Sequence, residues 1–118
     1  MVVADLNKKQ GLETIQEVNI NGTCNDNIFI LTDVTKISSV LSLYDQIEAH
    51  YGRPANILVN SAQVFQRFYP FADFNQSTFD HAWTGCLDAN LKGTFLMATV
   101  RLRILDSLLY KITIFRKG

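Results

Sequence analysis

The stretch Ala55–Ala62, A-N-I-L-V-N-S-A, decides how the rest of the chain is interpreted. Its apolar run Ile57–Val59 is short, is β-branched at two of three positions, and follows Gly52 and Pro54. Such a run predicts a strand that is buried on both faces. Strands of this kind belong to parallel sheets that are covered by helices. Asn60 then lies at the carboxyl end of the strand, where α/β folds bind their ligands.

The residues before this stretch alternate between strand and helix patterns. Apolar runs at 2–4 and 28–31 predict two further strands, which end near Asp5 and Asp33. Asn7 is expected to cap the first helix and Gly22 to end it, and Thr35 is expected to cap the second. Strand, helix, strand, helix, strand calls for an α/β fold with a parallel sheet and right-handed crossovers.

The second half of the chain predicts one long helix. After an irregular aromatic segment at 61–76, Ser77 and Asp80 have the spacing of a capping box. Apolar residues then recur at helical spacing up to Ser107, and Gly93 predicts a kink over residues 90–93. The run 108–115, L-L-Y-K-I-T-I-F, is expected to be a fourth strand.

Composition bounds the class of protein. With 118 residues, 47% hydrophobic residues and zero net charge, the chain is one globular domain at most, without the charge that nucleic-acid binding needs. Only residues 101–118 are basic, with 5 Lys/Arg against 1 Asp/Glu. This atypical tail is interpreted as solvated, or as the product of an altered reading of the parent's end. No apolar run is long enough to span a bilayer.

Cysteine and histidine usage indicates neither a disulfide framework nor a metal site. Cys24 and Cys86 are interpreted as thiols in a reducing compartment, which favours an intracellular protein, cytoplasmic or mitochondrial. His50 and His81 have no partners at metal-ligand spacing, so surface or capping roles are expected.

Three polar residues mark the candidate site: Asp5, Asp33 and Asn60, one at the end of each predicted strand. These ends share one edge of a parallel sheet, so the three side chains are expected to line one crevice. The Asp5 carboxylate suits the two hydroxyls of an adenosine ribose, and Asp33 can accept from an adenine amino group. The alternative is that both aspartates only end strands or cap helices, and spacing alone does not choose.

The chain resembles the classical short-chain dehydrogenases/reductases. V-V-A-D-L-N, T-D-V-T, Y-G-R-P-A-N-I-L-V-N-S-A, F-D-x-A-W and N-L-K-G-T-F occur in this order between Met1 and about Val100. Within the family, these motifs are similar to those of the 17β-hydroxysteroid dehydrogenase type 8 and 3-oxoacyl-carrier-protein reductase group. The resemblance implies a Rossmann-type fold and hydride transfer between NAD(H) and a hydroxyl or keto group of a steroid or acyl substrate.

The resemblance also implies roles for individual residues. Asp5, with Leu6 beside it, matches the acidic position that contacts the adenosine ribose and favours NAD over NADP, although Lys8 and Lys9 lie close by. The remaining cofactor positions are the adenine pair Asp33 and Val34, and Asn60, Ser61 and Ala62, whose backbone lies against the cofactor.

Asn90 matches the catalytic asparagine of the family, which interrupts its helix and holds a water in the proton relay. The alternative for Asn90 is an asparagine inside a helix that bonds to its own backbone.

Departures from the family pattern concern the phosphate turn and the proton donor. Gln63 stands where the family has glycine, and no glycine-rich turn precedes Asp5. The catalytic Tyr-x-x-x-Lys is missing, because the residues four after the tyrosines are Glu48, Ala55, Asp73 and Ile114.

We therefore expect a partial chain, truncated at both ends, inactive alone and marginally stable. In the family the absent first strand separates the Asp5 and Asn60 strands, so its removal leaves either a gap of about 10 Å or two strands that close up. Unpaired edges of this kind invite aggregation.

Two other functions stay open. The first is a non-catalytic product that binds a nucleotide weakly, or that docks on a full-length homologue or on a second copy through the helix at 77–107. The second is a receiver or flavodoxin-like domain, which fits the alternation but lacks the clustered acidic residues or the phosphate loop.

Overall fold

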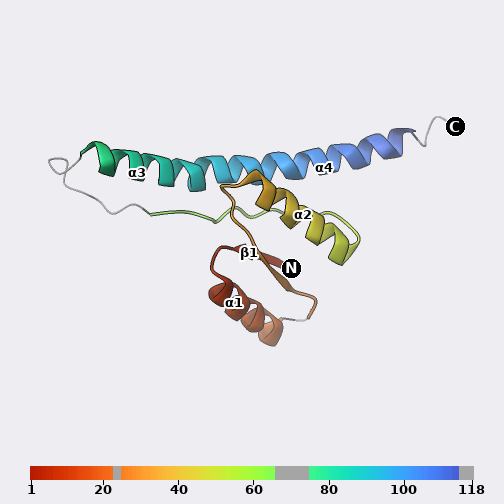
Figure 1. The fold of residues 1–118 in the computed structure, drawn as a ribbon. Coiled ribbons are helices and arrows are strands. Elements are labelled where there is room, and N and C mark those ends of the chain that lie inside the picture. The colour runs from red at the N-terminus through yellow and green to blue at the C-terminus, as the bar shows by residue number, and fades with distance from the viewer. Residues whose placement is uncertain (23–24, 66–74, 115–118) are drawn as a thin grey trace.

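A computed structural model describes residues 1–22, 25–65 and 75–114, without the side chains of His81 and of residues 105–114. Its secondary structure comprises a small parallel sheet, two helices that flank it, and one long helical rod (Figure 1). This is an α/β arrangement of the Rossmann type, as the strand and helix pattern predicts.

The sheet consists of two strands, β1 (Val2–Asp5) and β2 (Ile28–Leu31). They pair in parallel, with Val2 opposite Ile28 and Asp5 opposite Leu31, so the predicted parallel sheet is confirmed. The crossover is α1 (Lys8–Asn21), which Asn7 caps by accepting from Gln10 N at 3.1 Å. Gly22 ends this helix, and its N–H donates to Val18 O.

Helix α2 (Ile37–Tyr51) ends as predicted but does not begin as predicted. Gly52 closes it in the left-handed region, at φ 66°, as expected of a C-terminal glycine. Its start is not capped by Thr35. Lys36 precedes the first helical residue and gives no side-chain cap, because Thr35 donates its hydroxyl to Asp33 Oδ1 at 2.7 Å instead.

The rod is continuous from α3 (Gln76–Cys86) through η2 (Leu87–Gly93) to α4 (Thr94–Ile114). Where the sequence predicts a kink over residues 90–93, the helix takes the π-helical form η2 and stays continuous. The predicted capping box at Ser77 and Asp80 is wrong, because Asn75 and Thr78 form it: Asn75 Oδ1 accepts from Thr78 N, and Thr78 Oγ1 accepts from Asn75 N.

Two predicted strands are wrong. Residues 108–114 continue α4, because extending a formed helix costs less than starting a new strand without a partner, and no glycine or proline interrupts residues 94–114. Residues 57–59 lie in an extended segment that belongs to no sheet. Ile57 is 83% exposed and Val59 79%, because no strand lies beside them to pair with their backbone or cover their side chains.

The core lies between the sheet, α2 and α4. Buried side chains from all three meet there: Ile30, Val40, Leu43, Tyr44, Ile47, Met97 and Val100. Helix α1 covers the opposite face of the sheet, where Gly11 and Ile15 are buried. Figure 1 shows the resulting order of layers, from α1 through the sheet and α2 to the rod.

Close packing of α1 on the sheet depends on Gly11, since a Cβ there would overlap the ring of Phe29.

Candidate functional site

A groove lies between β1 and the extended segment 54–62, with α2 and Met97 beneath it. Its volume is about 700 Å³. Five of the residues predicted for cofactor binding line it: Asp5, Val34, Asn60, Ser61 and Ala62. Of the three strand-end residues that were expected to line one crevice, Asp5 and Asn60 line the groove and Asp33 does not. Leu6 and Asn90 are not among the lining residues either.

Asp5 is exposed at the end of β1 and already has one structural contact. Its Oδ1 accepts a hydrogen bond from Asn7 N at 2.7 Å, which fixes the turn into α1. Oδ2 accepts no hydrogen bond from the described part of the chain. One carboxylate oxygen is thus left to accept from a donor in the groove, while Leu6 beside it is 65% exposed.

Asp33 organises the loop after β2. Its Oδ1 accepts from Thr35 N at 3.0 Å and from Thr35 Oγ1, and its Oδ2 pairs with Lys36 Nζ at 2.9 Å. The hydrogen bonds from Thr35 and then Lys36 lower the pKa of Asp33 from 3.8 to about 2. A carboxylate has about four lone-pair sites, so these three contacts leave room for one further donor.

Val34 is held at the groove by its neighbour on the rod. A Cβ on Gly93 would lie only 2.8 Å from Val34 Cγ2, so the loop and the rod touch at this point. Val34 is half-buried and presents an apolar surface at the end of the sheet.

Residues 60–62 are exposed and extended, although the strand predicted to carry them does not form. These residues belong to the longer segment 54–65, which the rod contacts through Arg101 and Asn90. Arg101 Nε donates to Ala55 O at 3.0 Å, and another guanidinium nitrogen donates to Asn56 O. Gln63 causes no strain, because no non-glycine residue in the described ranges has a positive φ.

Asn90 holds the other end of the same segment. Its Oδ1 accepts from Val64 N at 2.7 Å and its Nδ2 donates to Val64 O at 3.1 Å, while Nδ2 also lies 3.3 Å from Cys86 Sγ. Asn90 lies within the π-helical turn η2, an irregularity that is frequent at functional sites. Its amide therefore bonds mainly to the distant Val64 backbone, in a way that sequence spacing does not reveal.

Arg101 and Tyr44 are positioning residues that the sequence analysis did not single out. Arg101 was grouped with a solvated tail, which is wrong, since its guanidinium bonds two carbonyls that no strand pairs. Its place one turn after the buried Met97 is the signal that indicates an inward face. Tyr44 O–H donates to Met97 O at 2.8 Å, joining α2 to the rod, and burial raises the pKa of this phenol.

Within the described ranges, no three His, Cys, Asp or Glu side chains gather closely enough to hold a metal ion. His50 Nε2 lies 2.7 Å from Asp26 Oδ1 at the surface. None of the described helices combines the length and apolarity that a membrane crossing needs. Cys24 and most of the aromatic segment 61–76 lie outside the described residues.

Comparison with known proteins identifies the family. The model of the short chain dehydrogenase family matches residues 1–108, which is most of the chain. The chain belongs to the short-chain dehydrogenase family. The match covers both strands, α1, α2 and the groove, and so assigns the two-stranded sheet to a partial Rossmann-type fold of this family.

Individual relatives agree with this assignment. The short chain dehydrogenase/reductase dpchG of Colletotrichum higginsianum is 33% identical over 93 residues, which is 78% of this chain and 33% of that protein. The short chain dehydrogenase/reductase dpmpG of Macrophomina phaseolina is 27% identical over 105 residues, or 89% of this chain and 57% of that protein.

A chloroplastic NADPH-dependent aldehyde reductase-like protein of Arabidopsis thaliana is 37% identical over 70 residues, or 58% of this chain and 24% of that protein. The chain thus spans between about a quarter and somewhat more than half of the length of these relatives.

Proposed function

We propose that this chain forms the adenosine-binding part of an NAD(P)-dependent oxidoreductase. The observation that supports the proposal is the shared groove, which Asp5 at the carboxyl end of β1 lines together with Val34 and Asn60–Ala62. Ligands of open α/β sheets bind at this edge. When bound, the nicotinamide cofactor supplies or accepts the hydride.

The groove fits the adenosine end of such a cofactor. The free Oδ2 of Asp5 accepts from a ribose hydroxyl, and Val34 offers an apolar contact to adenine. The pyrophosphate has no comparable partner, because the sequence has no glycine-rich turn. Binding by this chain is therefore expected to be weak.

We propose a preference for NAD(H) over NADP(H). A carboxylate at Asp5 repels a phosphate on the ribose, whereas Lys8 and Lys9, which are exposed on α1, act in the opposite direction. The Arabidopsis relative is named for NADPH, so the preference is a feature on which this chain is expected to differ.

The remaining proposals concern substrate and activity. The substrate is a steroid or acyl compound with a hydroxyl or keto group, as the family resemblance implies, and Asn90 is the asparagine of its proton relay. The chain alone is proposed to be inactive, because no tyrosine has a lysine four residues later. A general acid of pKa about 10 needs such a cation nearby to donate at neutral pH. Cysteine usage supports an intracellular location.

The test is a titration of the chain with NADH, followed by the amide chemical shifts. Shifts at Asp5, Val34 and Asn60–Ala62 are expected at high NADH, and weaker ones with NADPH. Asp5→Asn keeps the acceptor for Asn7 N but is expected to abolish the preference for NADH. The matched control is Asp45→Asn, an exposed position on α2 that should change nothing. Equal responses to both cofactors in the native chain would contradict the assignment of Asp5.

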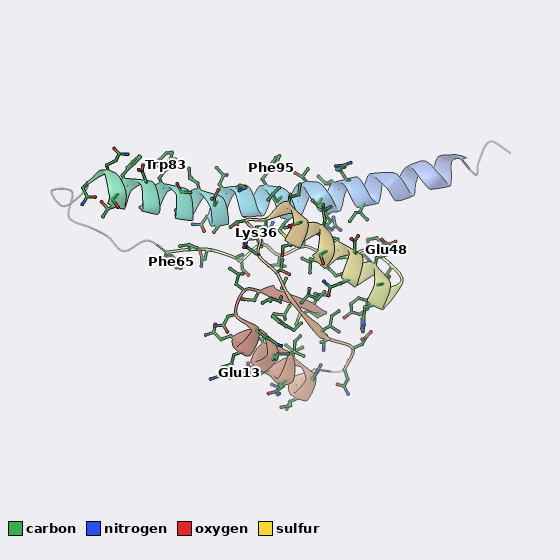
Figure 2. The ribbon with its side chains drawn as sticks, in the orientation of Figure 1. Glu13, Lys36, Glu48, Phe65, Trp83 and Phe95 are labelled. Carbon is green, nitrogen blue, oxygen red and sulfur yellow. The ribbon has the colours of Figure 1, made fainter. Side chains whose placement is uncertain are left out.

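A second candidate function is docking on another copy or on a full-length homologue through the rod. It is favoured by a row of exposed apolar side chains: Phe79, Trp83, Leu91, Phe95 and Leu102. Figure 2 shows Trp83 and Phe95 on the side of the rod that faces away from α2. In a regular α-helix these two residues would lie about a third of a turn apart. The wider turns of η2 bring them onto one side.

Docking is tested by sedimentation of the native chain, for which we expect a dimer at micromolar concentration. Phe95→Ser is expected to shift it to monomer. Phe65→Ser removes a phenylalanine that is 84% exposed but lies off the rod, and should leave the mass unchanged. A monomer at every concentration, with no capture of an intact homologue, would dispose of this candidate.

A further inference from the structure

Two asparagines of the chain precede a small residue: Asn21 precedes Gly22, and Asn60 precedes Ser61. A small following residue leaves its amide nitrogen accessible to the carbonyl carbon of the asparagine side chain, so both sequences are prone to spontaneous deamidation. Glycine favours the reaction more than serine, because it lacks a Cβ and turns more freely. By local sequence, Asn21 is therefore the more reactive of the two.

The fold holds Asn21 at both of the groups that this reaction uses. Asn21 is the last residue of α1, and its Nδ2 donates to Glu17 O at 3.0 Å. The N–H of Gly22 donates to Val18 O at 2.8 Å. The reaction removes Nδ2 and needs the Gly22 nitrogen as its nucleophile, so both hydrogen bonds must break first. The end of α1 thus has to open before Asn21 can react.

Neither restraint is found at Asn60. Both Asn60 and Ser61 are exposed and lie in a segment that belongs to no helix or sheet. In the described part of the chain, no hydrogen bond involves the side chain of Asn60 or the amide of Ser61. The rod bonds to this segment on either side, at Asn56 and at Val64. The backbone between these two points is free to bring the Ser61 nitrogen to the Asn60 side chain.

We propose that Asn60 is a site of spontaneous deamidation, and that the fold reverses the order of reactivity expected from the following residues. The Ser61 amide nitrogen gives up its proton to hydroxide and attacks Cγ of Asn60. The new N–Cγ bond forms, the Cγ–Nδ2 bond breaks, and ammonia leaves with a proton taken from water. Water then opens the cyclic succinimide at either carbonyl and yields aspartate or isoaspartate.

The products change one wall of the groove. Asn60 belongs to its lining, in which the charged side chains are Asp5 and Arg53. Deamidation adds a second carboxylate to this lining. Isoaspartate also adds a methylene to the main chain between the points where the rod holds the segment. The modification therefore alters the charge and the length of this wall, whichever ligand the groove binds.

The experiment incubates the native chain at mildly alkaline pH, below the temperature at which its circular dichroism changes, and in parallel in urea. Peptide mapping by mass spectrometry follows the conversion of Asn60 and Asn21. In the native chain, Asn60 is expected to convert first, as a mixture of aspartate and isoaspartate. In urea, Asn21 is expected to convert first. The ratio of the rate at Asn60 to the rate at Asn21 should fall on the order of tenfold on unfolding, because the end of α1 no longer protects Asn21.

Two controls identify the route of the reaction. Ser61→Val places a β-branched side chain beside the attacking nitrogen and is expected to suppress conversion at Asn60, while Asn21 reacts as before. Asn56 lies exposed in the same segment but precedes the β-branched Ile57, and it should stay intact in the native chain.

The proposal is overturned if Asn60 stays intact in the native chain, or if Asn21 converts before it there. Unchanged conversion of Asn60 in Ser61→Val would overturn the route through the Ser61 nitrogen. Aspartate without isoaspartate at Asn60 would overturn it as well, since direct hydrolysis of the side-chain amide yields aspartate alone.

Discussion

The loop after β2 stabilises the ionised form of the Asp33 carboxyl group. Thr35 and Lys36 donate to its carboxylate, so the ionised form is favoured and the pKa falls from 3.8 to about 2. A carboxyl group whose pKa is lower in the folded state stabilises the protein above the unfolded pKa, and that stabilisation is lost as the pH falls through the folded value. The relevant window is therefore pH 4 to 2.

Asp33→Asn is expected to lower the free energy of unfolding at pH 7 by about 0.5–1 kcal/mol, because an exposed pair such as Lys36–Asp33 contributes little. The gap between native and variant should close as the pH approaches 2. Urea unfolding at pH 7 and pH 2 measures both values. An undiminished gap at pH 2 would show that the charge of Asp33 is not the cause.

Gly93 is the residue where the rod approaches the loop after β2. Alanine there would place Cβ 2.8 Å from Val34 Cγ2 and 3.2 Å from Val34 Cβ. Alanine gains about 1 kcal/mol in helix propensity, but overpacking costs about 1–3 kcal/mol. Gly93→Ala is thus expected to destabilise the chain in urea unfolding. Gly93→Ala combined with Val34→Ala should recover the loss, and a single variant more stable than the native chain would refute the contact.

At the scale of elements, the segment 54–65 is ordered by the rod and not by a sheet. Asn90→Ala removes both hydrogen bonds to Val64. The Val64 amide is expected to exchange on the order of tenfold faster by NMR, whereas amides of β1 and β2 should not change. Leu91→Ala, at an exposed neighbouring position, is the control. Unchanged Val64 exchange in Asn90→Ala would mean that another contact holds the segment.

The elements also show what sequence reasoning can reach. Helix ends that are set by a capping residue, such as Asn7 or Gly52, are predictable because the cap and the helix lie next to each other in the chain. The strand predicted at 57–59 does not form, because a strand exists only when another strand pairs with it. Propensity alone could not exclude helix for 108–114, where the preceding helix continues.

In the candidate site, too, some residues could be predicted from the sequence and others could not. Asp5 and Asn60 could be predicted to share a crevice, because each follows an apolar run in the sequence, although the strand expected before Asn60 does not form. The use of Asn90 and Arg101 as anchors could not, because their partners Val64 and Ala55 are distant in the chain. Thr35 was predicted as a cap, but Asp33, two residues earlier, binds it more favourably.

The whole molecule is extended for its length. Its radius of gyration is 18.2 Å, against about 13.5 Å for a compact domain of this size, and its extents are 67 × 40 × 18 Å. A long rod beside a two-stranded sheet buries little apolar surface per residue, and two-stranded sheets are marginal in water. The chain alone is therefore expected to lose its circular dichroism gradually near ambient temperature. Cooperative unfolding of soluble monomer above ordinary growth temperature would contradict this expectation.

The most direct test of the proposed adenosine site is the pattern of nuclear Overhauser effects between NADH and the chain. Contacts are predicted from the ribose protons to Asp5 and from the adenine protons to the methyl groups of Val34, with none to the outer side chains Trp83 and Phe95. Contacts confined to the rod, or contacts of the nicotinamide ring with Val34 in place of adenine, would contradict the assignment of the groove.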